Sequence, residues 1–298
     1  MKQRPQSVGK TLVQLLLSLM LIFSILAAVA GGVGVFLTAS PSLLLFQLER
    51  QQAPAKTRSA LESYYQTEYN ATAVPPEVYL DVLSENWLRD AMELKITAAY
   101  DQLHGKNTAA QPDYSALEQS ITDYFETYAA ENGYEKDDSY TQKLENTIQD
   151  AEKKVDSVID VYHLGTLEKA GIWHKVQVLS KPLWLLFGGG VVLTLVLTLV
   201  LAAVLLVLRN YPLYWIGSGL FTDGVLLTLP AAVILGSGVI SRFSLKDAAV
   251  YSVFTGTMKA LVLGMLIFGG ILLAAGLVLL IGSIARERSQ VNGLPLKR

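Results

Sequence analysis

The run PLWLLFGGGVVLTLVLTLVLAAVLLVL, residues 182–208, contains no charged side chain and decides the fold class. Its 27 residues exceed the roughly 20 apolar residues that a helix needs to cross the hydrocarbon core of a bilayer. Two other charge-free runs, residues 11–48 and 260–285, meet the same requirement. We therefore predict a membrane protein with helical spans, because a helix satisfies its own backbone hydrogen bonds in lipid.

A fourth apolar segment, residues 213–240, is long enough to span but contains Asp223 and Pro230. With it, the fold class is an all-α integral membrane protein with four transmembrane helices. A helical-bundle domain on the extracytoplasmic side is expected between the first and second helices. The predicted segments are a cytoplasmic N-terminus (1–10), transmembrane helices (11–38, 182–208, 213–240 and 260–285), the helical domain (39–181), an outer loop with an interfacial helix (241–259) and a cytoplasmic tail (286–298).

The first apolar segment has two interpretations. Basic residues precede it, and Ala28-Val29-Ala30 resembles a signal-peptidase site, which is typical of a cleaved signal peptide. However, the apolar run continues to Leu37, beyond the roughly 7–15 residues of a signal peptide's apolar region. The length favours an uncleaved anchor, and the cleaved form remains the alternative.

Positive charge predicts the orientation in the cell (plasma) membrane. Short cytoplasmic flanks are enriched in lysine and arginine, whereas long translocated domains are exempt from this bias. Placing both termini in the cytoplasm and residues 39–181 outside puts eight basic residues inside and three in the short outer loop. The inner set is Lys2, Arg4, Lys10, Arg209, Arg286, Arg288, Lys297 and Arg298, and the outer set is Arg242, Lys246 and Lys259.

The charge of the predicted outer domain limits its partners. Residues 41–181 contain 23 acidic and 13 basic residues, a net charge of −10. Such a surface disfavours nucleic acid, whose phosphates require basic contacts. The chain has no cysteine, and its three histidines lack metal-binding spacing, so we expect no disulfide, no metal site and no cofactor.

Apolar residues in the outer domain recur at helical spacing. Residues 139–170 carry the clearest seam, in steps of three and four. Residues 113–131 repeat the spacing and stop at Gly133, a residue suited to a helix terminator. Further helices are expected over residues 76–104 and 43–69, and Pro54 either breaks the latter or opens a second helical segment. Together these helices predict an antiparallel bundle.

Eleven of the fourteen tyrosines lie in the outer domain. Tyrosine is favoured at binding surfaces because it offers a large contact area at low entropic cost. Tyr124 and Tyr128 fall on a helix seam, which indicates core packing. Tyr64, Tyr65 and Tyr69 cluster without a clear seam and form the candidate outer binding surface.

Asp223 is the candidate functional residue inside the membrane, because an ionisable group at bilayer depth suggests a site. Helical spacing puts Gly219, Pro230 and Ser237 on its face, with Thr222 adjacent in sequence. Small and polar residues mark helix–helix contacts in lipid, so this face should meet protein. Three interpretations remain: a protonated group that packs, the N-cap of a half-helix, and a proton or cation site.

These features favour a non-enzymatic membrane protein whose acidic helical domain binds a ligand or partner, in a sensor, scaffold or envelope-assembly role. The alternative is an oligomeric ion channel or proton-coupled transporter that uses Asp223. No catalytic residues are expected, since Asp223 stands alone and acid–base chemistry needs a second positioned group. The expected partners are the lipid bilayer and another membrane or envelope protein, with a second copy of the chain as one candidate.

Overall fold

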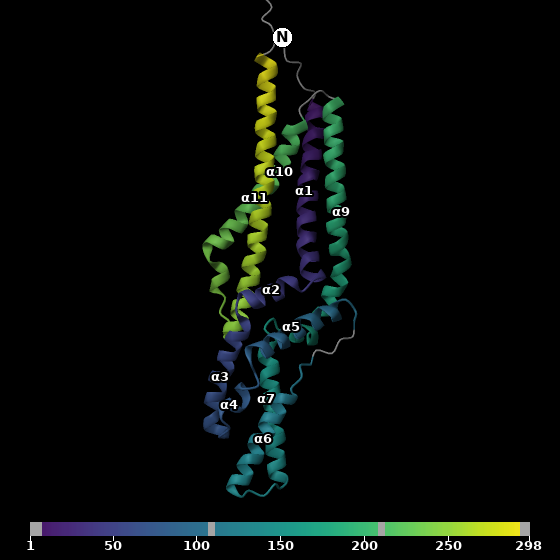
Figure 1. The fold of residues 1–298 in the computed structure, drawn as a ribbon. Helices are drawn as coiled ribbons and strands as arrows, with labels where there is room; N and C mark the ends of the chain where they lie inside the picture. The colour runs from purple at the N-terminus through teal and green to yellow at the C-terminus, as the bar shows by residue number, and fades with distance from the viewer. Residues whose placement is uncertain (1–7, 107–110, 208–211, 293–298) are drawn as a thin grey trace, which may run out of the picture. The chain divides into compact units, whose positions relative to one another are not determined.

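The computed structural model describes residues 8–106, 111–207 and 212–292, and every regular element in these ranges is helical (Figure 1). The elements in chain order are α1 (Val8–Ala39), α2 (Ser42–Arg50), α3 (Ala53–Thr72), α4 (Pro76–Leu80), α5 (Glu85–Leu103), α6 (Ser115–Asn132), α7 (Asp138–Ile159), α8 (Leu164–Lys169), α9 (Ile172–Val207), α10 (Pro212–Ser237), the 3₁₀ helix η1 (Val239–Arg242) and α11 (Ala248–Asn292).

Four helices are long and apolar enough to cross a membrane, namely α1, α9, α10 and α11. Their apolar stretches are Leu12–Ala39, Ile172–Ala203, Leu213–Ser237 and Ala248–Ala285. These helices indicate a membrane protein, in agreement with the sequence. The orientation stays a prediction. Of the basic residues on which it depends, Lys2, Arg4, Arg209, Lys297 and Arg298 lie outside the described residues, as do the side chains of Lys10, Arg286 and Arg288.

The chain divides into two compact units. Unit 1 comprises residues 1–37, 178–242 and 258–298, and it holds most of the apolar helices. Unit 2 comprises residues 38–177 and 243–257, and it holds α2 to α8.

Within unit 1, helices α1 and α9 lie side by side and antiparallel (Figure 1). A Cβ atom on Gly31 would lie 2.5 Å from the backbone nitrogen of Phe187, and one on Gly190 would lie 2.6 Å from that of Ala28. Ser24 and Thr194 share a hydrogen bond of 2.9 Å along the same contact. Glycine is therefore required where these two backbones meet, as is common between helices in membranes.

Helices α10 and α11 make a second antiparallel contact in unit 1. Gly224 lies against the backbone of Leu273, and Gly276 lies against the backbone of Phe221. A Cβ atom on Gly217 would lie 3.0 Å from the carbonyl oxygen of Gly276. Small residues on both helices let the two backbones approach this closely.

Unit 2 packs around a core of large side chains. Leu48, Leu61, Leu88, Met92 and Ile121 are fully buried there. The first turns of α11 contribute Ala249 and Val253 to the same core. Burial of such apolar side chains is a major favourable term in the folding of a helical unit.

Two helices expected from the sequence are each broken in the structure. The segment 76–104 divides into α4 and α5, because the Ser84 hydroxyl accepts the backbone N–H of Trp87 and caps a new helix. The segment 139–170 divides into α7 and α8, because the Asp160 carboxylate accepts the N–H groups of Leu164 and Gly165. A side-chain acceptor thus replaces the backbone acceptors that a continuous helix would use.

Other helix boundaries follow the sequence more closely. Helix α6 ends at Gly133, whose φ of 65° is the left-handed conformation that glycine adopts readily. Pro54 lies in the first turn of α3, where its missing N–H costs no hydrogen bond.

The start of the fourth membrane-length helix differs from the sequence prediction of an interfacial helix followed by a separate span. Helix α11 runs without a break from Ala248, and the Asp247 carboxylate accepts the N–H groups of Ala249 and Val250 at its start.

Candidate functional site

The most distinctive site in the described residues is a cavity of about 1050 Å³ within unit 2. We call it the tyrosine cavity. Helices α3, α6 and α7 supply most of its walls, and α4 and the segments between α3 and α4 and between α6 and α7 supply the rest. Its aromatic lining residues are Tyr64, Tyr65, Tyr79, Tyr124, Phe125, Tyr128, Tyr134 and Tyr140.

One side of the cavity is built by tyrosines of α3 and α4. Tyr65 and Tyr79 stack face to face, with ring centroids 4.0 Å apart and planes 2° apart. Tyr64 meets Tyr65 edge to face at 5.3 Å. The edge-to-face contact is a geometry that the ring quadrupole favours, and the parallel pair adds a large area of ring contact. The three packed rings form this wall of the cavity.

The opposite side is built by aromatic rings of α6 and the residues that follow it. Tyr124, Tyr128 and Tyr134 form a row, with successive centroids 6.1 and 5.9 Å apart. Phe125 contacts Tyr140 of α7 edge to face at 6.2 Å. The residues Tyr128 and Tyr134 are 46% and 61% exposed, so this row offers surface that a ligand could cover.

The phenolic hydroxyl groups of the cavity differ in their hydrogen bonding. Tyr124 donates to the carbonyl oxygen of Ala73 at 2.8 Å. Tyr65 is only 3% exposed, yet its hydroxyl has no hydrogen-bond partner among the described residues. The Tyr140 hydroxyl oxygen is also buried and has no hydrogen-bond partner in the described part of the chain. A buried polar group without a partner is costly, so a ligand atom that pairs with Tyr65 would gain stabilisation.

The environment of the α3 side keeps these phenols neutral. Burial, aided by the neighbouring Tyr64, raises the pKa of Tyr79 to about 12. Burial also raises the pKa of Tyr65, and the adjacent Tyr79 adds to this effect. Neutral phenols can donate a hydrogen bond and present a π face at the same time.

Charged residues also line the cavity. The acids are Glu68, Glu135, Asp137 and Asp150, and the bases are Lys143, Lys153 and Lys154. Lys153 pairs with Asp150 at 3.6 Å, and both side chains are more than two-thirds exposed, which makes the pair weak. The Lys154 ammonium lies over the ring of Tyr64, 4.0 Å from its centroid.

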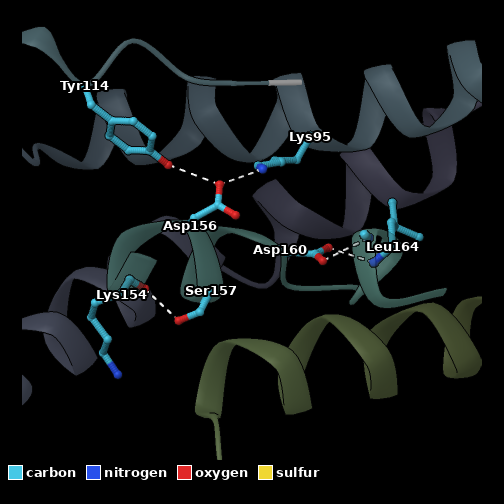
Figure 2. A network of polar contacts seen from close by, with 8 residues as sticks. Lys95, Tyr114, Lys154, Asp156, Ser157, Asp160 and Leu164 are labelled. Atoms are coloured by element: carbon cyan, nitrogen blue, oxygen red, sulfur yellow. Dashed lines mark hydrogen bonds and ion pairs between the residues drawn. The ribbon is translucent and has the colours of Figure 1, made fainter. Parts of the chain in front are cut away.

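A polar network on another side of α7 holds this helix in place (Figure 2). The Asp156 carboxylate accepts from the Lys95 ammonium at 2.6 Å and from the Tyr114 hydroxyl at 3.2 Å. These contacts tie α7 to α5 and to the residue that precedes α6. In Figure 2 the Lys154 side chain points away from this network. The network therefore holds α7 through Asp156, while Lys154 of the same helix lines the cavity.

The sequence-predicted outer surface overlaps the cavity in part. Tyr64 and Tyr65 line it, whereas Tyr69 is not among the lining residues and is 48% exposed. The sequence pattern assigned Tyr124 and Tyr128 to a helix seam, and the structure places both in the cavity wall. The other aromatic lining residues were missed. The only signal for them was the concentration of tyrosine in this part of the chain.

The intramembrane candidate, Asp223, lies in the interior of unit 1. Its side chain is 0% exposed, and neither carboxylate oxygen has a hydrogen-bond partner within the described ranges. Three hydroxyl groups of unit 1 donate to backbone carbonyl groups instead. Thr222 donates to the carbonyl of Ser218 at 2.8 Å, Ser18 to that of Trp215 at 3.4 Å, and Thr198 to that of Thr194 at 2.7 Å.

The residues expected on the Asp223 face occupy different environments. Gly219 is buried, and a Cβ atom there would lie 3.2 Å from the Leu21 side chain of α1. Pro230 and Ser237 are exposed, and the Ser237 hydroxyl donates to the carbonyl of Ile234. The structure therefore brings Gly219 and Asp223 into one buried region and leaves Pro230 and Ser237 outside it.

Comparisons of the chain with protein-family models, with curated proteins and with solved structures found no match. Within the described residues, no group of three or more histidine, cysteine, aspartate or glutamate side chains could hold a metal ion. The observations define a class: a helical membrane protein with four membrane-length apolar helices and a separate unit that contains a tyrosine-lined cavity.

Proposed function

We propose that this chain is a multi-pass protein of the cell membrane whose helical domain binds a small organic ligand in the tyrosine cavity. The observation that carries the proposal is the cavity itself, about 1050 Å³ in volume and lined by eight aromatic side chains. Ligand sites are concave and mostly apolar, with a few placed polar groups, and this volume lies at the upper end of their usual range.

The buried hydroxyl of Tyr65 supports a ligand in particular. It is 97% buried, lines the cavity, and has no partner in the described part of the chain. Packing alone would favour phenylalanine at such a position, because the hydroxyl group then loses water without gaining a hydrogen bond. A ligand atom that accepts from this hydroxyl, or donates to it, would supply the missing hydrogen bond.

We propose a binding role rather than a catalytic one, because eight aromatic side chains, seven of them tyrosines, line the cavity. The extracytoplasmic position of the domain is part of the proposal. It is supported by the distribution of basic residues, eight in the short flanks predicted to be cytoplasmic against three in the short outer loop. In this role, ligand binding outside the cell is passed to a partner protein in the membrane or envelope.

The test is ligand-observed NMR on the full chain in phosphatidylglycerol nanodiscs, whose headgroups carry no ammonium. The probes are small aromatic and aliphatic molecules of positive, neutral and negative charge. They include three molecules of similar shape and different charge: choline is the cation, tert-butylethanol is its neutral isostere, and tert-butylacetate, the anion of tert-butylacetic acid, carries a negative charge. Ala71→Trp fills the cavity from an exposed lining position, and Ala60→Trp makes the same change on α3 away from the cavity.

We expect at least one probe to bind saturably to the parent and to Ala60→Trp, and to lose binding in Ala71→Trp. Melting temperatures of the two variants should match, which shows that both fold. If no probe of any charge binds, or if Ala71→Trp binds as well as the parent, the proposal is wrong.

A second candidate function is supported by the burial of Asp223. A carboxylate that is 0% exposed and unpartnered among the described residues is suited to taking up a proton or cation inside a membrane helix bundle. In this role, copies of the chain assemble to line a conducting path. Proton and cation flux into liposomes holding the parent should disappear in Asp223→Asn, and the absence of flux in both proteins would exclude the role.

A further inference from the structure

The tyrosine cavity already holds one cation. The ammonium group of Lys154, from α7, lies 4.0 Å from the ring centroid of Tyr64, from α3. The π face of an aromatic ring carries negative electrostatic potential, and it attracts ammonium groups within about 6 Å. This contact shows that the Tyr64 face is accessible to a positively charged group from the cavity side.

Carboxylates reinforce the preference of this face for positive charge. Glu68 lies one helical turn after Tyr64, and Asp150 lies one turn before Lys154. Burial raises the pKa of the Tyr64 hydroxyl, and the negative charges of Glu68 and Asp150 raise it further. Both carboxylates line the cavity, and the pairing of Asp150 with Lys153 is too exposed to neutralise it strongly.

Beyond the Tyr64 face, the cavity offers further aromatic surface. The row of Tyr124, Tyr128 and Tyr134 offers exposed ring area on the α6 side. The unpartnered hydroxyl of Tyr65 adds one polar group at the wall. A ligand that matches these features carries a positive charge at one end and an apolar body at the other.

Resting on the proposed function, we propose that the tyrosine cavity selects an organic ammonium ligand, whose charged group takes the position over Tyr64 that Lys154 now occupies. Lys154 is then a built-in competitor that the ligand displaces. Glu68 and Asp150 supply the opposite charge, and the aromatic row covers the apolar body. The competing idea is that Lys143, Lys153 and Lys154 bind an anionic ligand, and the two ideas predict opposite effects of removing Lys154.

The test measures the affinity of the full chain, in phosphatidylglycerol nanodiscs, for choline, tert-butylethanol and tert-butylacetate. Lys154→Met removes the competing ammonium and keeps the apolar stem. Lys136→Met is the matched control, because Lys136 is exposed, pairs with Glu126 at 3.2 Å and does not line the cavity. Both variants change the net charge by the same amount, so a general electrostatic effect moves them together.

We expect choline to bind on the order of tenfold more tightly than its neutral isostere tert-butylethanol, as a cation–π contact with nearby carboxylates provides. Lys154→Met should tighten choline binding by about threefold or more, and Lys136→Met should leave it within about twofold. Tyr64→Phe keeps the π face and should keep the preference for choline, whereas Tyr64→Leu should abolish it. Melting temperatures report whether each variant is folded.

The outcomes separate this inference from the proposed function. If tert-butylacetate binds best and Lys154→Met weakens it, the ligand is an anion, and the cavity remains a binding site. If choline and tert-butylethanol bind equally, the cavity recognises shape without charge, and the ammonium inference is wrong. If none of the wider probe set binds either, the proposed function falls together with the inference.

Discussion

Units 1 and 2 are both helical, yet their helices pack by opposite means. In unit 1, glycine lets backbones touch, as at Gly31, Gly190, Gly224 and Gly276. In unit 2, large side chains such as Leu48 and Met92 fill the space between helices. Lipid gives no hydrophobic drive for helix association, so close contact must supply it, whereas water rewards burial of large apolar groups. The difference in packing is what lipid around unit 1 and water around unit 2 would produce.

The same comparison explains which polar groups each unit leaves unpaired. Unit 2 leaves the Tyr65 hydroxyl without a partner in the described residues, at the wall of a cavity that a ligand can enter. Unit 1 leaves both oxygens of Asp223 without one, inside a bundle of apolar helices. Each is a cost to folding that points to a role, a ligand contact in one case and an ion or proton site in the other.

The largest expected effect is a loss of stability at alkaline pH, which should unfold unit 2 and leave unit 1 folded. Burial raises the pKa of Tyr79 and of Tyr100 to about 12, from an ordinary value near 10. Above pH 10 the unfolded chain releases protons that the folded chain keeps, so stability falls as pH rises toward 12. One pH unit above the ordinary value, each tyrosine costs about 1.4 kcal/mol, or about 3 kcal/mol for the pair.

Tyrosinate absorbance and far-UV circular dichroism of the detergent-solubilised chain measure this transition. We expect cooperative loss of the unit 2 helices between pH 10 and 12 and survival of unit 1, whose described residues include one tyrosine, Tyr214. Unchanged ellipticity while all tyrosines ionise would show that their burial does not stabilise the fold.

The second prediction compares one substitution in the two units. Met92 is fully buried in unit 2, and Met92→Ala should cost about 2–5 kcal/mol because it removes transfer energy and leaves a cavity. Met20 is 51% exposed on α1, and Met20→Ala should cost less than about 1 kcal/mol, since lipid or detergent fills the space. Thermal melting of the solubilised protein distinguishes the two. Equal losses would mean that the α1 surface is packed against protein.

The third prediction reverses the direction of the size change. Gly276→Leu puts a side chain against the backbone of Phe221 and should destabilise unit 1 by about 1–3 kcal/mol through overpacking. Gly264→Leu on the same helix is the control, because no atom lies within 4 Å of a Cβ atom there. The measurement is the melting temperature by fluorescence-detected size exclusion. If both variants melt alike, close backbone contact is not what holds α10 and α11 together.

The smallest predicted effect concerns a helix cap in unit 2. Ser84→Ala removes the hydroxyl that accepts the Trp87 N–H at 3.2 Å, which should cost about 1 kcal/mol. Ser63→Ala, in the exposed part of α3, should change stability by less than about 0.5 kcal/mol. Chemical denaturation monitored by circular dichroism gives both values, and a loss at Ser84 no larger than at Ser63 would refute the capping role.

The spans and several helix ends could be predicted from the sequence because their causes are local. Charge-free length reveals the membrane helices, and Gly133 and Pro54 mark boundaries by their own backbone preferences. The breaks at Ser84 and Asp160 were missed. Apolar spacing continues across both, and only the capping side chains stop the helices.

The tyrosine cavity lay beyond sequence reasoning for a different reason. Its walls come from elements far apart in the chain, such as Tyr64 of α3 and Tyr140 of α7, and periodicity says nothing about which elements meet. The helical spacing of Tyr128 would also be the same whether its ring were buried in a core or lined a cavity. In contrast, the burial of Asp223 could be expected from its position in the sequence alone, because an ionisable side chain inside a membrane-length apolar run is expected to face other helices and not lipid.

The most direct test of the central claim is single-cysteine labelling in intact cells, which is clean because the chain has no cysteine of its own. Ser63→Cys lies on the exposed surface of unit 2, and Leu199→Cys replaces a side chain of α9 that is 69% exposed. We predict that a membrane-impermeant maleimide labels Ser63→Cys in intact cells and labels Leu199→Cys only after denaturation in detergent. Labelling of Ser63→Cys only after lysis, or equal labelling of both in intact cells, would contradict a chain that holds its binding domain in water outside the membrane and its glycine-packed helices in lipid.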